Sequence, residues 1–286
     1  MNNSMNQLGP ISYITGTGKI AQILLALVLS IVLYIVFLTV ELLYKSVRNV
    51  SSTRVDILPL TVSSQDKPYE FEQNPQANNA TLLPLSDNEH TGAEFTYAFF
   101  LWVDPSTFKQ ENGLLHIMHK GNAVYYPLLG PGVFLHSNTN TLRVYMNSSK
   151  TWNNYVDVEN IPMKKWVHVI IMARDNGVEV YINGNIIKKL KIDNATLYQN
   201  FGNLYLFSQR SMVLNANLIP SLKGESLQIF GSYTGKLSSV IYFTYALSYT
   251  EIQSLISEGP SSRTVKNSEE SPPYLEDTWW VSDYSR

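Results

Sequence analysis

The chain of 286 residues contains no cysteine and carries almost no net charge. Without cysteine, a disulfide framework and thiolate metal sites are excluded, which fits a domain that faces a reducing compartment. The 21 basic and 23 acidic residues give a formal net charge of -2, so no overall basic field favours nucleic acid as a partner. The sequence therefore predicts neither a disulfide-stapled domain nor a nucleic-acid-binding protein.

Patterns typical of catalysis or metal binding are also scarce. His116 and His119 form H-x-x-H, but on a β-strand this odd separation should send the two rings to opposite faces. Asp157 and Glu159 share one strand face, and we interpret them as solvated surface acids. No order of serine, histidine and acid has local motif support. We predict no catalytic residue, no cofactor and no metal site, and hence a protein that is not an enzyme.

One long apolar run is present, at residues 20–43. As a helix, its 24 residues would span about 36 Å, enough to cross a hydrocarbon core of about 30 Å. The run is too long for a signal peptide, and neither early positive charge nor a cleavage site accompanies it. We predict an uncleaved transmembrane helix in contact with the lipid bilayer, with anchoring residues Ile20, Leu24, Leu27, Ile31, Ile35, Leu38 and Leu43.

The charges beside this run predict its orientation. Lys19 and the α-amine precede it, whereas Lys45, Arg48 and Arg54 follow it. Since cytoplasmic flanks carry the excess of lysine and arginine, we expect a single-pass membrane protein whose large C-terminal part lies on the cytoplasmic side.

The clearest folded signal lies at residues 166–192. An apolar β-branched segment is followed by Asn176-Gly177, then by alternating apolar and polar residues up to Asn183-Gly184, and then by a third strand-like segment. Asn-Gly supplies the positive φ that a two-residue hairpin turn requires, and a period of two marks a strand with one buried face. We predict an antiparallel meander of three strands.

The same stretch carries a family resemblance. A tryptophan that opens an apolar strand, a turn, and a strand ending in Tyr181-Ile-Asn-Gly184 resemble the core of the concanavalin A-like, laminin-G-like jelly rolls. Residues 235–252 are similar to the last strand of that family with its Ala-Leu-Ser turn and short helix, and residues 95–104 and 114–122 are similar to its first strands. The resemblance covers residues 92–259 and implies an all-β, two-sheet antiparallel sandwich rather than any one reaction.

Further strands are expected at 95–103, 114–119, 123–126, 132–136, 141–146, 155–158, 204–207, 227–230 and 236–244, with a long polar loop at 208–225. Ser248 and Glu251 predict a capping box that begins a short helix, which Gly259-Pro260 ends. The predicted organisation is a polar flank (1–19), a transmembrane helix (20–43), an extended linker (44–91), the sandwich (92–259) and a C-terminal tail (260–286).

The tail is unusually aromatic for a disordered segment. Because aromatic side chains bury large areas at interfaces, we predict that the tail docks on its own domain or on a protein partner through Tyr274, Trp279, Trp280 and Tyr284.

Retaining glucanases of this fold carry Glu-x-Asp-x-x-Glu, and this chain lacks that pattern. Some family members bind calcium on rim loops. Asp175, Asn176 and Asp193 could be such ligands, although turn chemistry explains them equally well.

Two function classes follow. The first is a non-enzymatic, membrane-anchored structural or interaction protein; in its architecture the chain resembles minor capsid proteins of large icosahedral DNA viruses, which implies capsid proteins as partners and a place between an internal virion membrane and the shell. The second is a membrane-anchored carbohydrate-binding module in which exposed aromatics such as Trp102, Trp152 or Tyr155 stack on sugar rings. The cytoplasmic orientation weighs against the second class.

Overall fold

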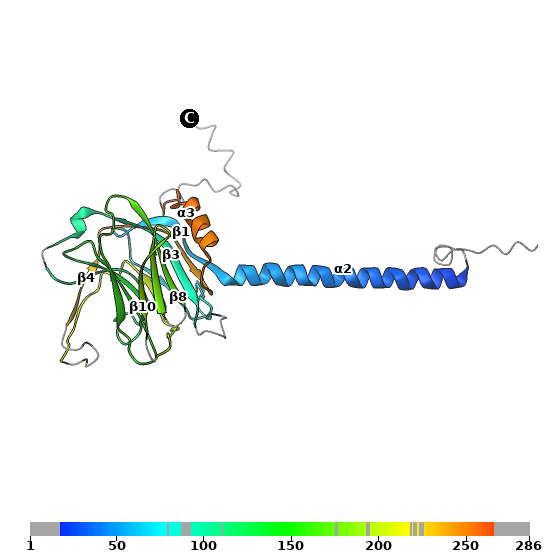
Figure 1. Ribbon diagram of the computed structural model, residues 1–286, viewed down its shortest axis with the longest axis horizontal. Coiled ribbons are helices and arrows are strands. Elements are labelled where there is room, and N and C mark those ends of the chain that lie inside the picture. Colours follow the sequence, from blue (N-terminus) through cyan, green and yellow to red (C-terminus); the bar gives the residue numbers. More distant parts are fainter. Residues whose placement is uncertain are drawn as a thin grey trace, which may run out of the picture. The chain divides into compact units, whose positions relative to one another are not determined.

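The computed structural model of the protein describes residues 18–78, 80–86, 93–109, 111–174, 177–192, 195–217, 219, 222 and 226–265. The chain divides into two compact units, residues 1–52 and residues 53–286. The first unit contains most of one long helix, and the second contains a β-sandwich with one short helix (Figure 1).

Helix α2 (Lys19–Thr53) contains the long apolar run. Within it, Gln22–Leu43 is long and apolar enough to cross a membrane, and none of its most apolar window is buried. Of the predicted anchor residues, Leu24, Leu27, Ile31, Ile35, Leu38 and Leu43 have exposed side chains, and the side chain of Ile20 lies outside the described part of the chain. Since exposed apolar surface of this extent is unfavourable in water, the helix is a candidate membrane span; membrane insertion itself stays a prediction.

Two sheets of mainly antiparallel strands form the sandwich, as predicted; one pair in the eight-stranded sheet is parallel. The six-stranded sheet has the order β1-β14-β3-β8-β9-β10. Its strands are β1 (Arg54–Ser63), β14 (Gly235–Phe243), β3 (Phe95–Val103), β8 (Trp166–Arg174), β9 (Gly177–Ile182) and β10 (Asn185–Lys191). The predicted meander is therefore β8–β9–β10, and Asn183 and Gly184 both adopt positive φ in its second turn. Asp175 and Asn176 of its first turn lie outside the described residues.

The eight-stranded sheet has the order β12-β13-β4-β5-β6-β7, and β11 and β2 pair beside β4. Its strands are β12 (Ser211–Leu214), β13 (Leu227–Ser232), β4 (Leu114–Gly121), β5 (Leu129–His136), β6 (Leu142–Met146), β7 (Asn154–Val158), β11 (Asn203–Leu206) and β2 (Tyr69–Phe71). A short 3-10 turn, η1 (Pro105–Thr107), follows β3.

The main core lies between the two sheets, where the inward residues of both meet. Phe99 and Leu101 of β3, Ile117 of β4 and Val169 of β8 have no exposed surface. The outer side of β3 is also apolar, because helix α3 (Tyr249–Glu258) packs on the outer face of the six-stranded sheet through Ile252 and Leu255. The apolar outer side of β3, for which the sequence favoured a covering loop, is therefore covered by a helix. Ser248 and Glu251 form the predicted capping box.

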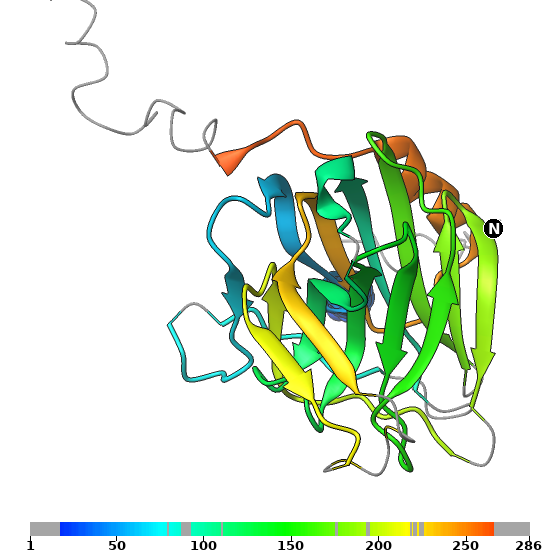
Figure 2. The same ribbon diagram turned by 90° about the vertical axis from the view of Figure 1, so that its left-hand side faces the viewer.

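Several segments differ from the sequence prediction. Residues 44–53 of the predicted linker continue helix α2, and residues 69–71 form β2. Residues 54–63, placed in the linker, form edge strand β1, which pairs with β14 along its length. Residues 123–126 form a turn and not a strand, because Tyr125 has φ of 64° and points into a small core. Residues 211–214 of the expected long loop form β12. After α3, the chain runs to the outer edge of β1, where Thr264 bridges Thr61 in parallel (Figure 2).

Candidate functional site

The outer face of the eight-stranded sheet is the surface that the sandwich leaves without a helix. A second, smaller core fills the middle of this face. Tyr125 from the β4–β5 loop and Trp152 from the β6–β7 loop fold over the strands and pack with Phe134 and Tyr145; Tyr125 has no exposed surface and Trp152 is 7% exposed. Two pockets open beside this small core.

His116 and His119 lie together on this outer face, so their predicted separation is wrong. A β-bulge at Ile117 turns two consecutive residues, Ile117 and Met118, toward the main core and returns His119 to the outer side. His116 Nε2 lies 2.7 Å from His119 Nδ1, His119 Nε2 lies 3.0 Å from the Asn122 carbonyl oxygen, and the Ser208 N–H donates to His116 Nδ1 at 2.9 Å.

These bonds define which nitrogen of each ring carries the proton. The Asn122 carbonyl only accepts, so His119 Nε2 must donate and His119 Nδ1 must accept. His116 Nε2 is then the donor to His119, and its Nδ1 accepts from Ser208. Both rings are consequently neutral, and burial lowers the pKa of both, that of His119 to about 4. The pair is a structural link between two loops, and no group of three metal-ligating side chains occurs among the described residues.

Two buried asparagines hold the neighbouring loops in place. Asn147 accepts from the Leu129 N–H and donates to the carbonyls of Pro127 and Trp152. Asn200 accepts from the Gly202 N–H and donates to the carbonyls of Lys120 and Gly130. Because each side chain satisfies backbone groups of two or more segments, the loops at this end form a fixed frame.

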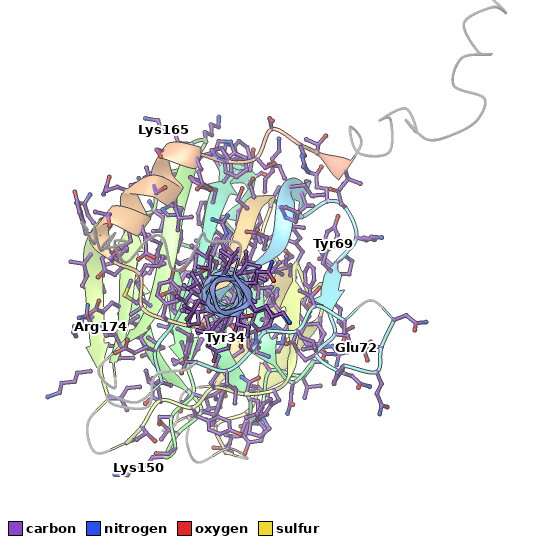
Figure 3. All side chains as sticks on the ribbon, turned by 90° about the vertical axis from the view of Figure 1, so that its right-hand side faces the viewer. Tyr34, Tyr69, Glu72, Lys150, Lys165 and Arg174 are labelled. Atoms are coloured by element: carbon purple, nitrogen blue, oxygen red, sulfur yellow. The ribbon has the colours of Figure 1, made fainter. Side chains whose placement is uncertain are left out.

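A pocket of about 660 Å³ opens between these loops, and we call it the loop-end pocket. Tyr126 and Tyr198, which are 39% and 44% exposed, form part of its wall, and the rings of Tyr126 and Trp152 meet in a T-shaped arrangement at a centroid distance of 5.3 Å. The segment Ser148–Thr151 adds hydroxyl groups and the ammonium group of Lys150, whose place at this end is labelled in Figure 3. The pocket thus combines accessible ring faces with hydrogen-bonding groups.

A second pocket, of about 470 Å³, lies at the other side of the small core, and we call it the Arg143 pocket. Asn112, His136, Asn138, Arg143 and Gln228 contribute its polar groups. Arg143 donates to both carboxylate oxygens of Asp157, at 2.7 and 2.6 Å, and its guanidinium lies 4.0 Å from the centre of the Tyr155 ring.

The charges of this second pocket are matched within the protein. Burial alone would raise the pKa of Asp157, but the two hydrogen bonds from Arg143 and the proximity of the His136 ring, whose Nε2 lies 3.6 Å from Asp157 Oδ1, outweigh it and lower the pKa. Asp157 is therefore not the solvated surface acid that the sequence suggested. An ion pair so closely satisfied leaves little net charge for an ionic ligand.

The sequence-predicted site residues have different outcomes. Of the three aromatics proposed to stack on sugars, Tyr155 is 42% exposed, Trp102 is half-buried and Trp152 is buried. His168, a histidine within the apolar strand β8, is buried and its ring packs against Phe100. The tail residues Tyr274, Trp279, Trp280 and Tyr284 and the alternative calcium ligands Asp175, Asn176 and Asp193 lie outside the described residues.

Sequence reasoning missed Tyr126, Tyr198, Asn147 and Asn200. Tyr126 was assigned to a strand. Asn147 begins an Asn-Ser-Ser sequon, but its burial to 2% exposure excludes glycosylation of the folded chain. Isolated asparagines in polar loops give no local signal of a shared function, because their partners are distant in sequence.

The family model described as the concanavalin A-like lectin/glucanases superfamily matches residues 76–253, more than half of the chain, and the chain belongs to this superfamily. A search of curated protein sequences found no match.

Among solved structures, the chain is similar to the receptor binding domain of botulinum neurotoxin D, with 11% identity and a TM-score of 0.44, covering 67% of this chain and 43% of that chain. It is also similar to Trypanosoma rangeli sialidase in complex with the inhibitor DANA, with 14% identity and a TM-score of 0.38, covering 57% and 22%. The chain spans less than half of either structure, and the likeness concerns the fold alone.

Proposed function

We propose that this chain is a membrane-anchored binding protein whose sandwich takes a carbohydrate ring in the loop-end pocket. The observation that carries this proposal is the pair of exposed tyrosine rings beside a segment of hydroxyl groups. Buried Asn147 and Asn200 hold the backbones of the neighbouring loops through the carbonyls of Pro127, Trp152 and Gly130. Sugars present an apolar ring face and a rim of hydroxyls, and a wall of this composition is complementary to both. The superfamily includes lectins, which supports the same ligand class.

Binding rather than catalysis fits the chemistry of the described residues. The carboxylate of Asp157 is held by Arg143, and that of Glu179 by Lys189 at 2.6 Å. A glycosidase needs two carboxyl groups facing each other across a substrate, and neither pocket is lined by such a pair in the part of the chain that the structure describes. The absence of an enzymatic activity stays a prediction.

A glycan array probed with the full chain in a mild detergent tests the proposal. Binding of at least one neutral glycan should weaken by about three- to tenfold in Tyr198→Ala and in Tyr126→Ala, because each change removes one stacking ring. Tyr249→Ala is the matched control, since Tyr249 is 71% exposed on α3, outside the pocket. An array without signal, or binding that all three variants retain, would overturn the carbohydrate assignment.

The exposed apolar face of α2 and the aromatic tail favour a second candidate, a structural link between a membrane and a protein layer. We propose in this case a minor capsid protein that joins an internal virion membrane to the shell, with capsid proteins as partners through Tyr274, Trp279, Trp280 and Tyr284. The predicted cytoplasmic orientation and the absence of cysteine are compatible with this placement.

Cross-linking of particles separates the two candidates. The structural link predicts that the chain stays with particles after mild detergent and cross-links to shell proteins through residues 261–286. Release of a free monomer by detergent alone would contradict it.

A further inference from the structure

Strand β10 ends the six-stranded sheet, where it pairs with β9. Its outer edge has no hydrogen-bonded strand among the described residues, although β7 of the other sheet lies near it and a bulge occurs at Ile187. Nearly the whole strand is exposed, including two adjacent isoleucines, Ile186 at 50% and Ile187 at 46%. Open edges with apolar side chains are the usual places where a further strand adds to a sheet.

The charge of β10 restricts what can add to it. The strand carries Lys188, Lys189 and Lys191 and no acidic residue; the neighbouring Glu179 on β9 pairs with Lys189. Two β10 strands would bring these lysines together, and like charges disfavour that pairing. A strand with acidic residues and large apolar side chains would instead match both the lysines and the isoleucines.

The chain itself contains a segment of that composition. Residues 274–284 read YLEDTWWVSDY, with Glu276, Asp277 and Asp283 and no basic residue, and they are rich in aromatic and β-branched residues. We propose that residues 274–284 of one copy add as a strand to β10 of a second copy, with Trp279 and Trp280 beside the exposed isoleucines.

A second copy is favoured by where the described chain ends. Thr264 bridges Thr61 on β1, and β1 is the opposite edge of the sheet from β10. Thr264 lies one strand spacing outside β1, and an added strand would lie one spacing outside β10, so seven spacings of about 4.8 Å, about 34 Å, separate the two positions. The nine steps from Val265 to Tyr274 reach only about 30–32 Å when fully extended in a straight line, and α3 lies on the outer face between the edges. Such pairing is head-to-tail, so it produces rows of copies and not closed dimers.

Cross-linking between cysteines provides a direct test, because the natural chain has none. One preparation carries Ile187→Cys and the other Trp280→Cys, and the two full-length chains are mixed in detergent under mild oxidation. We expect a covalent dimer that contains one copy of each variant. No dimer, or a disulfide that forms within one chain when both changes are combined at high dilution, would overturn the pairing between copies.

Charge reversal provides a second test with its own control. Lys188→Glu with Lys191→Glu should raise the dissociation constant of self-association by about tenfold or more, as should ending the chain after Val265. Adding Glu276→Lys and Asp277→Lys to the first variant should restore association. Lys164→Glu with Lys165→Glu makes the same charge change at exposed positions outside β10 and should have no effect. Equal effects of both reversals, or no rescue, would contradict the proposal.

Discussion

Single polar residues fix the geometry of the loops at one end of the sandwich. His116 and His119 join the β4–β5 loop to the segment after β11, and Asn147 and Asn200 join the backbones of several loops. All four side chains are almost fully buried, so each bond is protected from water and each unsatisfied group would be costly. The loop-end pocket therefore depends on residues that do not line its aromatic wall.

The histidine pair predicts an acid-sensitive stability. Both pKa values are lowered in the folded state, so below pH 6.5 the unfolded chain binds protons that the folded chain does not, and the free energy of unfolding falls as the pH falls toward 4. Each such proton contributes at most about 1.4 kcal/mol per pH unit. Urea unfolding between pH 4 and pH 7 should show a shallower pH dependence in His119→Gln than in the natural chain. An unchanged slope would contradict the neutral pair.

Buried Lys120 predicts a second pH dependence of the free energy of unfolding, at alkaline pH. Its side chain is 2% exposed, its Nζ donates to the Gly202 carbonyl at 2.6 Å, and burial lowers its pKa to about 8. Between pH 8 and pH 10.5 the unfolded chain retains a proton that the folded chain has lost, so the free energy of unfolding rises with pH. Lys120→Met should stabilise the domain at pH 7 by about 1–3 kcal/mol, and this gain should shrink by pH 10. Denaturant titrations at the two pH values measure both effects.

At the scale of elements, α3 covers one outer face of the sandwich and the loops cover the other. The helix is short, but Ile252 and Leu255 complete an apolar cluster with Ile170 and Met172 of β8. Turn chemistry and the capping box made this helix predictable from sequence. Its role as the cover of β3 was not predictable, because that depends on which face of the sheet the chain returns to after β14.

Truncation of a buried side chain in α3 measures how much the packing of this helix on the sheet contributes to the free energy of unfolding. Leu255→Ala should lower the free energy of unfolding by about 2–4 kcal/mol, since it leaves a cavity against the sheet. Tyr249→Ala, on the exposed side of the same helix, should change it by less than about 0.5 kcal/mol. A small effect of Leu255→Ala in urea unfolding would show that the helix is weakly docked.

At the scale of the whole molecule, the chain joins a helix long and apolar enough to cross a membrane to a β-sandwich for which we propose a binding function. The window Gln22–Leu43 contains no charge except Glu41, near its end, and the sandwich unit has its own core. Carbohydrate binding and strand addition use different parts of the sandwich, the loop-end pocket and the β10 edge. Both proposals can therefore be tested in one chain without interference.

Membrane insertion predicts that the full-length chain resists extraction with alkaline carbonate. Ile31→Arg with Ile35→Arg should release it, because each arginine at the centre of a span costs about 2.5–3.5 kcal/mol. Exchange of the same residues for leucine is the control. The intact mass of the membrane-bound chain distinguishes a retained anchor from a cleaved signal sequence, and protease accessibility of the sandwich reports its side.

The sequence by itself determined the elements whose signals are local: the apolar run of α2, the alternation of β8 to β10 with its Asn183-Gly184 turn, and the capping box of α3. The superfamily and the two-sheet architecture followed from their order. Only the tertiary structure decided which residues share the outer face of the eight-stranded sheet, because the bulge at Ile117 depends on register with β5, and because Asn147 and Asn200 bond to backbone groups that are distant in sequence. Bulges and loop contacts depend on how the strands pack against one another, so the pattern of residues along the sequence does not predict them.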